Sequence, residues 1–443
     1  MPVWLYNQPM LYITNARIWI EKGFIENANI AIASGKIKAV GKNIKVPPGA
    51  KASTFAALHA NWQSWCATAP FWTPDLHKAK KSMHDRPVAD AFAKDIRINA
   101  KGLTIFPGLI DAHCHLGCFE DGVGPLGFHG NELTDPNTGH LDIKDSIFPR
   151  DLSFPDARAG GVTTAAVFPG SGNLIGGLNI VMKTAGRTVD ELVLVHKHSM
   201  KMALGENPFR VYGSQNKAPA TRFGNAGEIR KAFTNARNYL AKKKAWEALS
   251  AKERKAKPFD IDVRNENLAL VLERKIGVRF HIHRADDIHT ALRLSREIGF
   301  DITLDHCTEG HLIPDLIRQY GVAAVIGPIG TSRVKYELRE RSTRTCRVLH
   351  EHGVPFAICT DHPVIPIQQL SICAALAVRE GLPEEAALNA LTIGAARILG
   401  IDKRLGSLQA GKDADFCVVD GHILDARDRV KATFIDGNCA YAE

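Results

Sequence analysis

The sequence predicts an α/β protein in which a TIM-like (β/α)8 barrel is joined to a small β-sandwich domain built from both chain ends. Three observations predict this fold. Apolar strand-like runs alternate with helical patterns over residues 108–400, and both chain ends alternate apolar and polar residues in short pieces. In addition, 443 residues with a 45% hydrophobic content can bury a large core.

The barrel prediction rests on the order of the elements. The expected strands are TIFPGLIDAH, GVTTAAVF, MKMALG, VRFHIH, DITLDH, GVAAVIG and PFAICTD, and helical patterns cover residues 287–297 and 384–399. Repeated strand-then-helix units indicate right-handed crossovers and a parallel sheet. Seven or eight such units in roughly 300 residues favour a closed barrel over an open sheet.

The remaining residues divide between the β-sandwich domain and an insertion. Residues 1–50, 95–107 and 401–443 have the short alternating runs of hairpins, with a turn expected at Ser34-Gly35. Residues 51–94 have no clear period, so we treat them as an insertion of uncertain structure. We interpret its histidines His59, His77 and His84 as surface or hydrogen-bonded residues rather than metal ligands.

Composition excludes several classes of function. Much of the net charge of +9 lies in residues 242–257, which we expect to form a solvated helix that ends at Pro258, so we expect no nucleic-acid partner. No apolar run has the 18 residues of a membrane span, and no secretory signal opens the chain. The nine cysteines lack paired spacing, which is typical of free thiols in a reducing compartment. We therefore expect a cytoplasmic protein with no membrane contact.

Residues that bind metals stand at the ends of several expected strands. His113 and His115 are two apart on one strand, so their side chains point to the same face. The ends of three further strands carry, in chain order, His281 with His283, His306, and Asp361. The loops after the strands form the pocket of this barrel class. The pattern therefore predicts a metal centre at the mouth of the barrel.

Longer motifs carry a resemblance to a known family. FPGLIDAHCHLG, MKMALGENPFRVYG, HIHRADDI, LDHCTEG, CTDHPVIP and LGSLQAGKDADFCVVDG resemble segments of the amidohydrolase superfamily, in its imidazolonepropionase-like branch. The resemblance implies one or two divalent metal ions, with zinc expected, held by His113, His115, His281, His306 and Asp361. Lys201 resembles the lysine that other members carboxylate to bridge two metals, and Glu206 resembles the glutamate of one-metal members. Both remain open as the bridging ligand.

The expected reaction is the hydrolysis of a carbon–nitrogen bond in an amide, cyclic amide or dipeptide by metal-activated water. Asp361 is the expected general base, and His283 is expected to contact the substrate or to support the site by a hydrogen bond. Arg284, Arg333 and Lys183 are candidate partners of a substrate carboxylate, and Tyr212 is a candidate donor to an oxyanion. We expect a small-molecule substrate and, by analogy with the family, a homo-oligomer.

Two alternatives use the same fold. A heterocycle deaminase would need the His-x-x-Glu arrangement common after the fifth strand in that group, and HIHRADDI lacks the glutamate. A non-catalytic scaffold would be expected to have lost metal ligands, whereas every expected ligand position is filled here.

Overall fold

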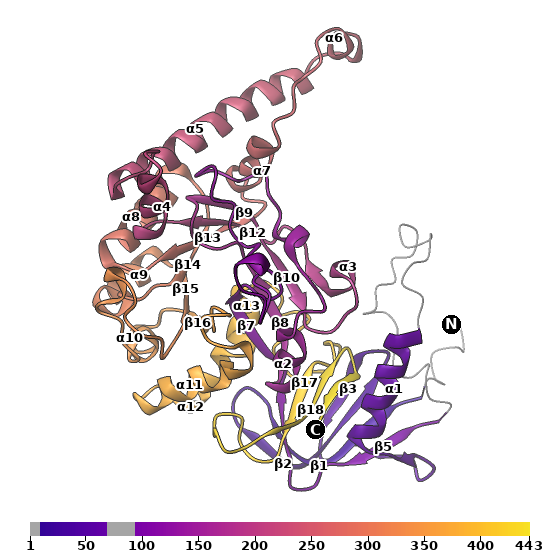
Figure 1. Cartoon of the computed structure of the whole chain (residues 1–443). Coiled ribbons are helices and arrows are strands. Elements are labelled where there is room, and N and C mark those ends of the chain that lie inside the picture. Colours follow the sequence, from indigo (N-terminus) through magenta and orange to yellow (C-terminus); the bar gives the residue numbers. More distant parts are fainter. Residues whose placement is uncertain (1–8, 69–93) are drawn as a thin grey trace.

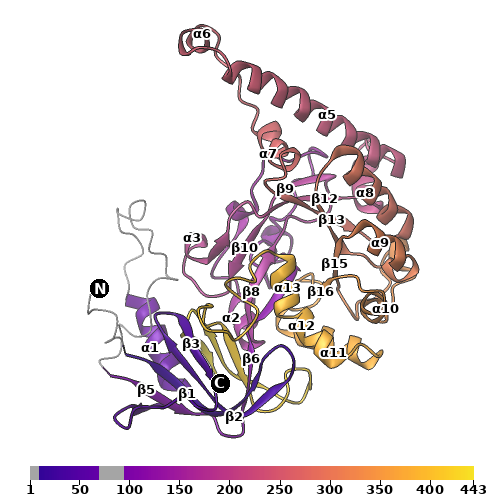
Figure 2. The ribbon, with the colours of Figure 1, turned by 180° about the vertical axis from the view of Figure 1, so that it is seen from behind.

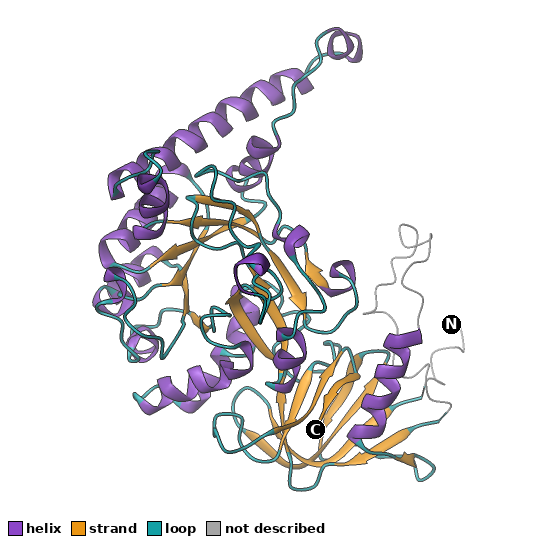
Figure 3. Ribbon diagram, in the orientation of Figure 1, coloured by secondary structure: helices purple, strands orange, loops and turns teal. Residues whose placement is uncertain are grey.

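The protein consists of a larger body of strands and helices and a broad β-sheet packed beside it (Figures 1 and 3). The computed structural model describes residues 9–68 and 94–443. His77 and His84 of the expected insertion lie outside the described residues. Each part has its own apolar core, one on the broad sheet and a larger one between the other strands and their helices.

The broad sheet combines strands from both chain ends, which lie side by side in both views (Figures 1 and 2). Its strands are β1 (Leu11–Trp19), β2 (Phe24–Ala33), β3 (Lys36–Gly41), β4 (Lys51–Ala52), β5 (Ile96–Asn99), β6 (Thr104–Pro107), β17 (Phe416–Val419), β18 (Val430–Ile435) and β19 (Asn438–Ala442). The hydrogen-bonded path runs β19-β18-β17-β6-β1-β2-β3, with β5 pairing with both β1 and β4. The described strands thus form one connected nine-stranded sheet, so the two separate sheets of a sandwich are not confirmed.

Local sequence explains the hairpin between β2 and β3. Ser34 and Gly35 both have positive φ, 51° and 69°, which matches the two-residue turn that suits the twist of antiparallel strands. The turn predicted at this position is confirmed. Gly35 is also tightly packed, because a Cβ there would lie 3.0 Å from the carbonyl oxygen of Asp436.

The strands of the larger body curve around a common interior (Figure 3). One sheet has the order β11 (Val193–Val195), β10 (Ile180–Lys183), β8 (Val162–Val167), β7 (Leu109–Cys114). The other has the order β16 (Phe356–Ile358), β15 (Ala323–Ile326), β14 (Ile302–His306), β13 (Gly277–Ile282), β12 (Ser199–Ala203), β9 (Ile175–Leu178). Neighbours from β12 to β16 are parallel, as are β7 and β8, whereas β9 and β10 are antiparallel to their partners. Among the described residues the ladders form two sheets, so complete closure of the barrel is not confirmed.

The helices of the larger body lie outside these strands, and the one at residues 251–256 projects away from them (Figures 1 and 3). They are α2 (Ser153–Ala159), α3 (Val189–Leu192), α4 (Glu206–Ser214), α5 (Arg222–Glu247), α6 (Ala251–Ala256), α7 (Val263–Leu272), α8 (Ala285–Ile298), α9 (Pro314–Tyr320), α10 (Thr345–Glu351), α11 (Leu370–Arg379), α12 (Glu384–Ala390) and α13 (Ile393–Ile398), while α1 (Phe55–Thr68) lies against the broad sheet. Short 3-10 turns cover Gly124–Gly127, Ile143–Ser146, Gly310–Leu312, Tyr336–Leu338 and Ile367–Gln369. Among the helices of the described residues, none has both the length and the apolar character that a membrane crossing requires.

Two helix predictions need correction. The helix expected over 242–257 is the end of α5 followed by α6, because Ser250 accepts a hydrogen bond from the backbone N–H of Glu253 and starts a new helix with a capping box. The pattern over 384–399 is divided into α12 and α13 at Thr392, whose backbone is not helical. The helix predicted over 287–297 is confirmed as the interior of α8.

Candidate metal centre and active site

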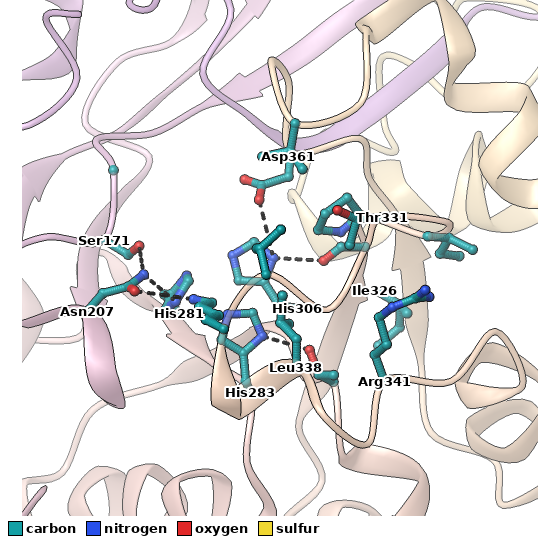
Figure 4. A pocket seen from close by; sticks show the side chains of 18 of the residues that line it. Ser171, Asn207, His281, His283, His306, Ile326, Thr331, Leu338, Arg341 and Asp361 are labelled. Atoms are coloured by element: carbon teal, nitrogen blue, oxygen red, sulfur yellow. Dashed lines mark hydrogen bonds and ion pairs between the residues drawn. The ribbon is translucent and has the colours of Figure 1, made fainter.

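The residues predicted to bind metal converge at the carboxyl ends of four parallel strands. β7 ends with His113 and Cys114, and His115 follows it, while β14 ends at His306. His281 lies on β13 with His283 just beyond it, and Asp361 follows β16. A pocket of about 440 Å3 opens above them, lined by His115, Lys201, His281, His283, His306 and Asp361 among others (Figure 4).

Three of these side chains form a compact donor group. The Nε2 atoms of His113 and His115 lie 3.6 and 3.3 Å from Oδ1 of Asp361. Ligand atoms of all three residues lie within 4.8 Å of one another, a spacing that suits one small cation. Nδ1 of His306 lies 4.0 Å from Oδ2 of the same aspartate, so this fourth ring lies beside the group.

Hydrogen bonds behind the rings determine which nitrogen faces the pocket. Nδ1 of His115 donates to the carbonyl of Phe168 at 2.7 Å, and Nδ1 of His306 donates to the carbonyl of Gly327 at 2.8 Å. Nδ1 of His113 lies 2.9 Å from Oδ2 of Asp305. Because a carbonyl only accepts, these contacts leave Nε2 as the basic atom of the ring, which is the arrangement of metal-binding histidines.

The carboxylate of Asp305 is itself held by an arginine. Nε and Nη2 of Arg279 donate to Oδ1 of Asp305 at 2.9 and 2.5 Å, and Nη2 also donates to the carbonyl of Ala112 at 2.9 Å. Burial alone would raise the pKa of Asp305, but Arg279 and His113 outweigh it and hold the pKa well below its usual range. Asp305 therefore stays ionised and orients His113.

Asp361 is positioned by contacts between β7 and the segment after β16. Its N–H donates to the carbonyl of His113 at 3.1 Å, and the carboxylate of Asp111 accepts from the N–H groups of His113 and Thr360. Asp361 and His306 have φ values of 56° and 67°, in the left-handed region that non-glycine residues rarely occupy. Such strained backbone persists only where its surroundings impose it, and it is frequent at functional sites.

The protonation states also suit a cation. Burial lowers the pKa of His113, His281 and His283 well below the ordinary value, so these rings are neutral at neutral pH. Burial raises the pKa of Asp361, but the facing imidazoles of His306 and His115 outweigh it and keep the pKa below its usual range. Neutral imidazoles and an ionised carboxylate are the forms that bind metal ions.

Of the two candidates for the bridging ligand, only Lys201 reaches the histidines. Its side chain is fully buried on β12, and Nζ lies 3.2 Å from Nε2 of His113. Glu206 begins α4 and its carboxylate accepts from the N–H of Glu337 at 3.3 Å, outside the pocket lining. Burial lowers the pKa of Lys201 to about 8, which increases the fraction of neutral amine.

Glu337 is not among the residues predicted from the sequence, and it forms a second buried group with His281 and His283. Oε1 of Glu337 lies 2.8 Å from Nζ of Lys335 and 3.7 Å from Nε2 of His283. Nδ1 of His283 lies 2.7 Å from the hydroxyl of Thr308, while its Nε2 is buried without a hydrogen-bond partner. Glu337 lies in the loop after β15, where no strand end or motif distinguishes it in the sequence.

The structure does not bring the predicted substrate-binding residues to the pocket. Tyr212 is buried, and its hydroxyl donates to Asn173 and to the carbonyl of Asp135. Arg284 forms a two-point ion pair with Asp286, and Arg333 donates to the carbonyl of Arg339. None of the three lines the pocket. Arg284 and Arg333 lie near strand ends, as predicted, but their side chains are hydrogen-bonded outside the pocket.

Lys183 is likewise absent from the pocket lining. Its ammonium group is buried at the end of β10, where it contacts the carboxylates of Asp413, Asp415 and Asp436. It connects the larger body to the broad sheet. The insertion residue His59 also has a structural contact, because its Nδ1 lies 3.1 Å from the carbonyl oxygen of Cys439.

Comparison with known proteins identifies the family. The model of the amidohydrolase family matches residues 104–440, which include every strand-end residue described above. The chain belongs to the amidohydrolase family. The family consists of hydrolases of carbon–nitrogen bonds, and the resemblance predicted from the sequence motifs is confirmed.

Individual relatives agree with this assignment. The amidohydrolase tasK of Hapsidospora irregularis is 29% identical over 380 residues, which are 80% of this chain and 38% of that protein. The imidazolonepropionase of Cupriavidus necator is 30% identical over 149 residues, or 32% of this chain and 34% of that enzyme. This chain therefore aligns with only about a third of the length of these two relatives.

Solved structures show the same fold. An amidohydrolase from Thermotoga maritima superposes with a TM-score of 0.84 and 34% identity, covering 98% of this chain and 100% of that chain. A prolidase complexed with N-methylphosphonate-L-proline superposes with a TM-score of 0.57 at 14% identity, which indicates a shared fold alone. These neighbours place the larger body among the TIM-barrel-like α/β domains.

Proposed function

We propose that this protein is a metal-dependent hydrolase that cleaves an amide, cyclic amide or dipeptide bond in a small molecule. The observation that carries the proposal is the donor group of His113, His115 and Asp361, whose ligand atoms lie within 4.8 Å of one another. His115 and Asp361 of this group line a pocket of about 440 Å3. Family membership supports the reaction class.

The residues present fit a divalent metal such as zinc. His113, His115 and Asp361 would hold it, with His281 and His306 available for a second ion and Lys201, after carboxylation, as the bridge. Burial lowers the pKa of His113, and Nε2 of His283 is buried with no hydrogen-bond partner among the described residues, so both rings offer a basic nitrogen that could bind a cation. When bound, the metal would lower the pKa of a water molecule and polarise the carbonyl of the substrate.

The chain supplies the proton transfers and the orientation. Asp361 is ionised and faces the pocket, so it is placed to accept a proton from the attacking water and to return it to the leaving nitrogen. His283 lines the same pocket with a free Nε2, so it is placed to donate a hydrogen bond to the substrate or accept one from it. Asn207 and Ser171, hydrogen-bonded to each other at 2.9 Å, line the pocket beside His281 and can orient a carbonyl (Figure 4).

The test measures metal content and hydrolysis together. Purified protein should contain zinc or a similar divalent ion, lose activity after chelation and regain it when the ion is restored. The substrate panel should contain N-acyl amino acids, dipeptides, simple cyclic amides, and imidazolonepropionate, from which one group of relatives takes its name. Protein that binds no divalent metal, or metal-loaded protein that hydrolyses no member of the panel, would contradict the proposal.

A further inference from the structure

The pocket contains one cation that has no counter-ion among the described residues. Arg341 lines the pocket, and its side chain makes no hydrogen bond or ion pair within the described residues. Its Nε is buried and unpartnered. A buried donor without a partner carries a desolvation cost, so a missing acceptor is the simplest explanation for its position.

The pocket also contains two lysines, and both have partners within the protein. Lys201 lies 3.2 Å from Nε2 of His113 and belongs to the metal centre. Nζ of Lys335 is 2.8 Å from Oε1 of Glu337 and 3.3 Å from Oδ1 of Asn207. Lys335 is therefore neutralised within the protein, and Arg341 alone is left to pair with an anion of the substrate.

We propose that the substrate carries a carboxylate and that Arg341 binds it. This inference rests on the proposed function, because it assumes that the pocket binds the substrate. A guanidinium group can donate two parallel hydrogen bonds to a carboxylate, which gives both affinity and orientation. Arg341 thus takes the role that the sequence analysis assigned to Arg284 and Arg333, whose guanidinium groups are hydrogen-bonded within the protein.

The arrangement of the pocket specifies the rest of the molecule. Figure 4 shows Asn207 and Ser171 on one side of the three histidines, and Arg341 with Leu338 on the other. A substrate that reaches Arg341 with its carboxylate can therefore place its amide at the histidines and Asp361.

The outer lining of the pocket is apolar. Phe128, Val334 and Val364 line it with 53%, 76% and 50% of their surface exposed. Apolar side chains so exposed around a pocket favour an apolar group on the ligand. The substrate class that fits all three features is an N-acylated amino acid, or a dipeptide, with a free carboxylate and an apolar side chain.

The test compares a carboxylate with its uncharged amide. N-acetyl-L-phenylalanine and N-acetyl-L-phenylalaninamide are titrated by calorimetry into metal-loaded Asp361→Asn protein, so that binding is measured without turnover. We expect the carboxylate to bind about 10- to 100-fold more tightly, the range for hydrogen bonds to a charged group. Arg341→Met should remove the preference, and Arg341→Lys should retain part of it.

Arg344→Met is the matched control, since Arg344 is exposed, three residues further on, and does not line the pocket. It should leave the preference unchanged. Equal binding of both probes by the Asp361→Asn protein that retains Arg341 would overturn the inference. So would a preference that survives Arg341→Met in a folded variant.

Hydrolysis of the panel is measured separately. If the protein prefers the carboxylate through Arg341 but hydrolyses no member of the panel, the proposed function is wrong and the carboxylate site stands.

Discussion

The protein contains two buried clusters of charged residues at strand ends, and they differ in how completely their nitrogen atoms are paired. In the first, Lys183 lies between three carboxylates, with Nζ 3.0 Å from Asp413, 3.0 Å from Asp415 and 2.5 Å from Asp436. An ammonium group has three protons, so each has an acceptor. The ammonium group is therefore fully paired without a ligand, and it connects the broad sheet to β10.

The metal centre is built from similar residues but is incomplete. His113 and His115 use Nδ1 for contacts with Asp305 and Phe168, so their Nε2 atoms point to a shared space beside Asp361. In the neighbouring group, Nε2 of His283 has no hydrogen-bond partner within residues 9–68 and 94–443. Burial and charge are therefore not sufficient to identify a functional site. The distinguishing property is basic atoms that converge and remain unpaired.

The largest effect should follow from Asp361→Asn in the metal centre. The amide cannot serve as a base and is a weaker metal ligand than the carboxylate, so the variant is assayed when saturated with zinc. Its kcat should fall by about 100- to 10,000-fold, while the free energy of unfolding changes little. Kinetics on the best substrate of the panel and urea unfolding measure the two quantities. Asp301→Asn, at an exposed position, is the control. Retained turnover would remove Asp361 from the role of base.

Lys183→Met should have the converse effect. It leaves three buried carboxylates without their shared cation, so the free energy of unfolding should fall by about 3 to 5 kcal/mol. Metal content and kcat/KM of the folded fraction should stay at the parent level, because Lys183 does not line the pocket. Lys252→Met, at an exposed position on α6, should change neither quantity. A variant as stable as the parent would show that the cluster does not stabilise the fold.

Asp305→Asn tests the support of the metal centre. The carboxylate that orients His113 would be replaced by a neutral group, which should raise the Kd for zinc by about 10- to 100-fold. Zinc competition with a chromophoric chelator measures this, and circular dichroism confirms that the variant is folded, since Arg279 also loses its counter-ion. A folded variant with the zinc affinity of the parent would contradict the orienting role.

The smallest effect concerns pH and the Lys183 cluster. Burial raises the pKa of Asp415 from 3.8 to about 6, so between these values the folded state holds a proton that the unfolded state has released. The contribution of this group to stability is therefore complete below the unfolded pKa and is lost as the pH rises through the folded one. In urea unfolding, the stability of the parent relative to Asp415→Asn should fall between about pH 4.5 and 6.5. If the difference in unfolding free energy between the parent and Asp415→Asn is the same at both ends of this pH range, the raised pKa of Asp415 is wrong.

Much of the fold was accessible from local patterns. All the expected strand runs of the larger body contain strands, and the hairpin at Ser34-Gly35 follows from two adjacent turn residues. The breaks at Ser250 and Thr392 were not foreseen, because a capping hydrogen bond or a single non-helical residue outweighs the helical pattern around it. One connected sheet forms in place of a sandwich because β6 pairs with β17. The sequence of neither strand indicates this pairing.

For the site, the sequence by itself determined the kinds of ligand and their positions at strand ends, because the alternation of side chains and the strand-then-helix order are local properties. Only the tertiary structure decided which side chains meet. It placed Lys201 rather than Glu206 beside His113 and paired Lys183 with Asp413 across 230 residues of chain. It also brought Glu337 beside His281 and His283, and Arg341 to the pocket. These contacts join distant segments, and their partners are selected by the burial and pairing of charges in the folded chain, which no local pattern encodes.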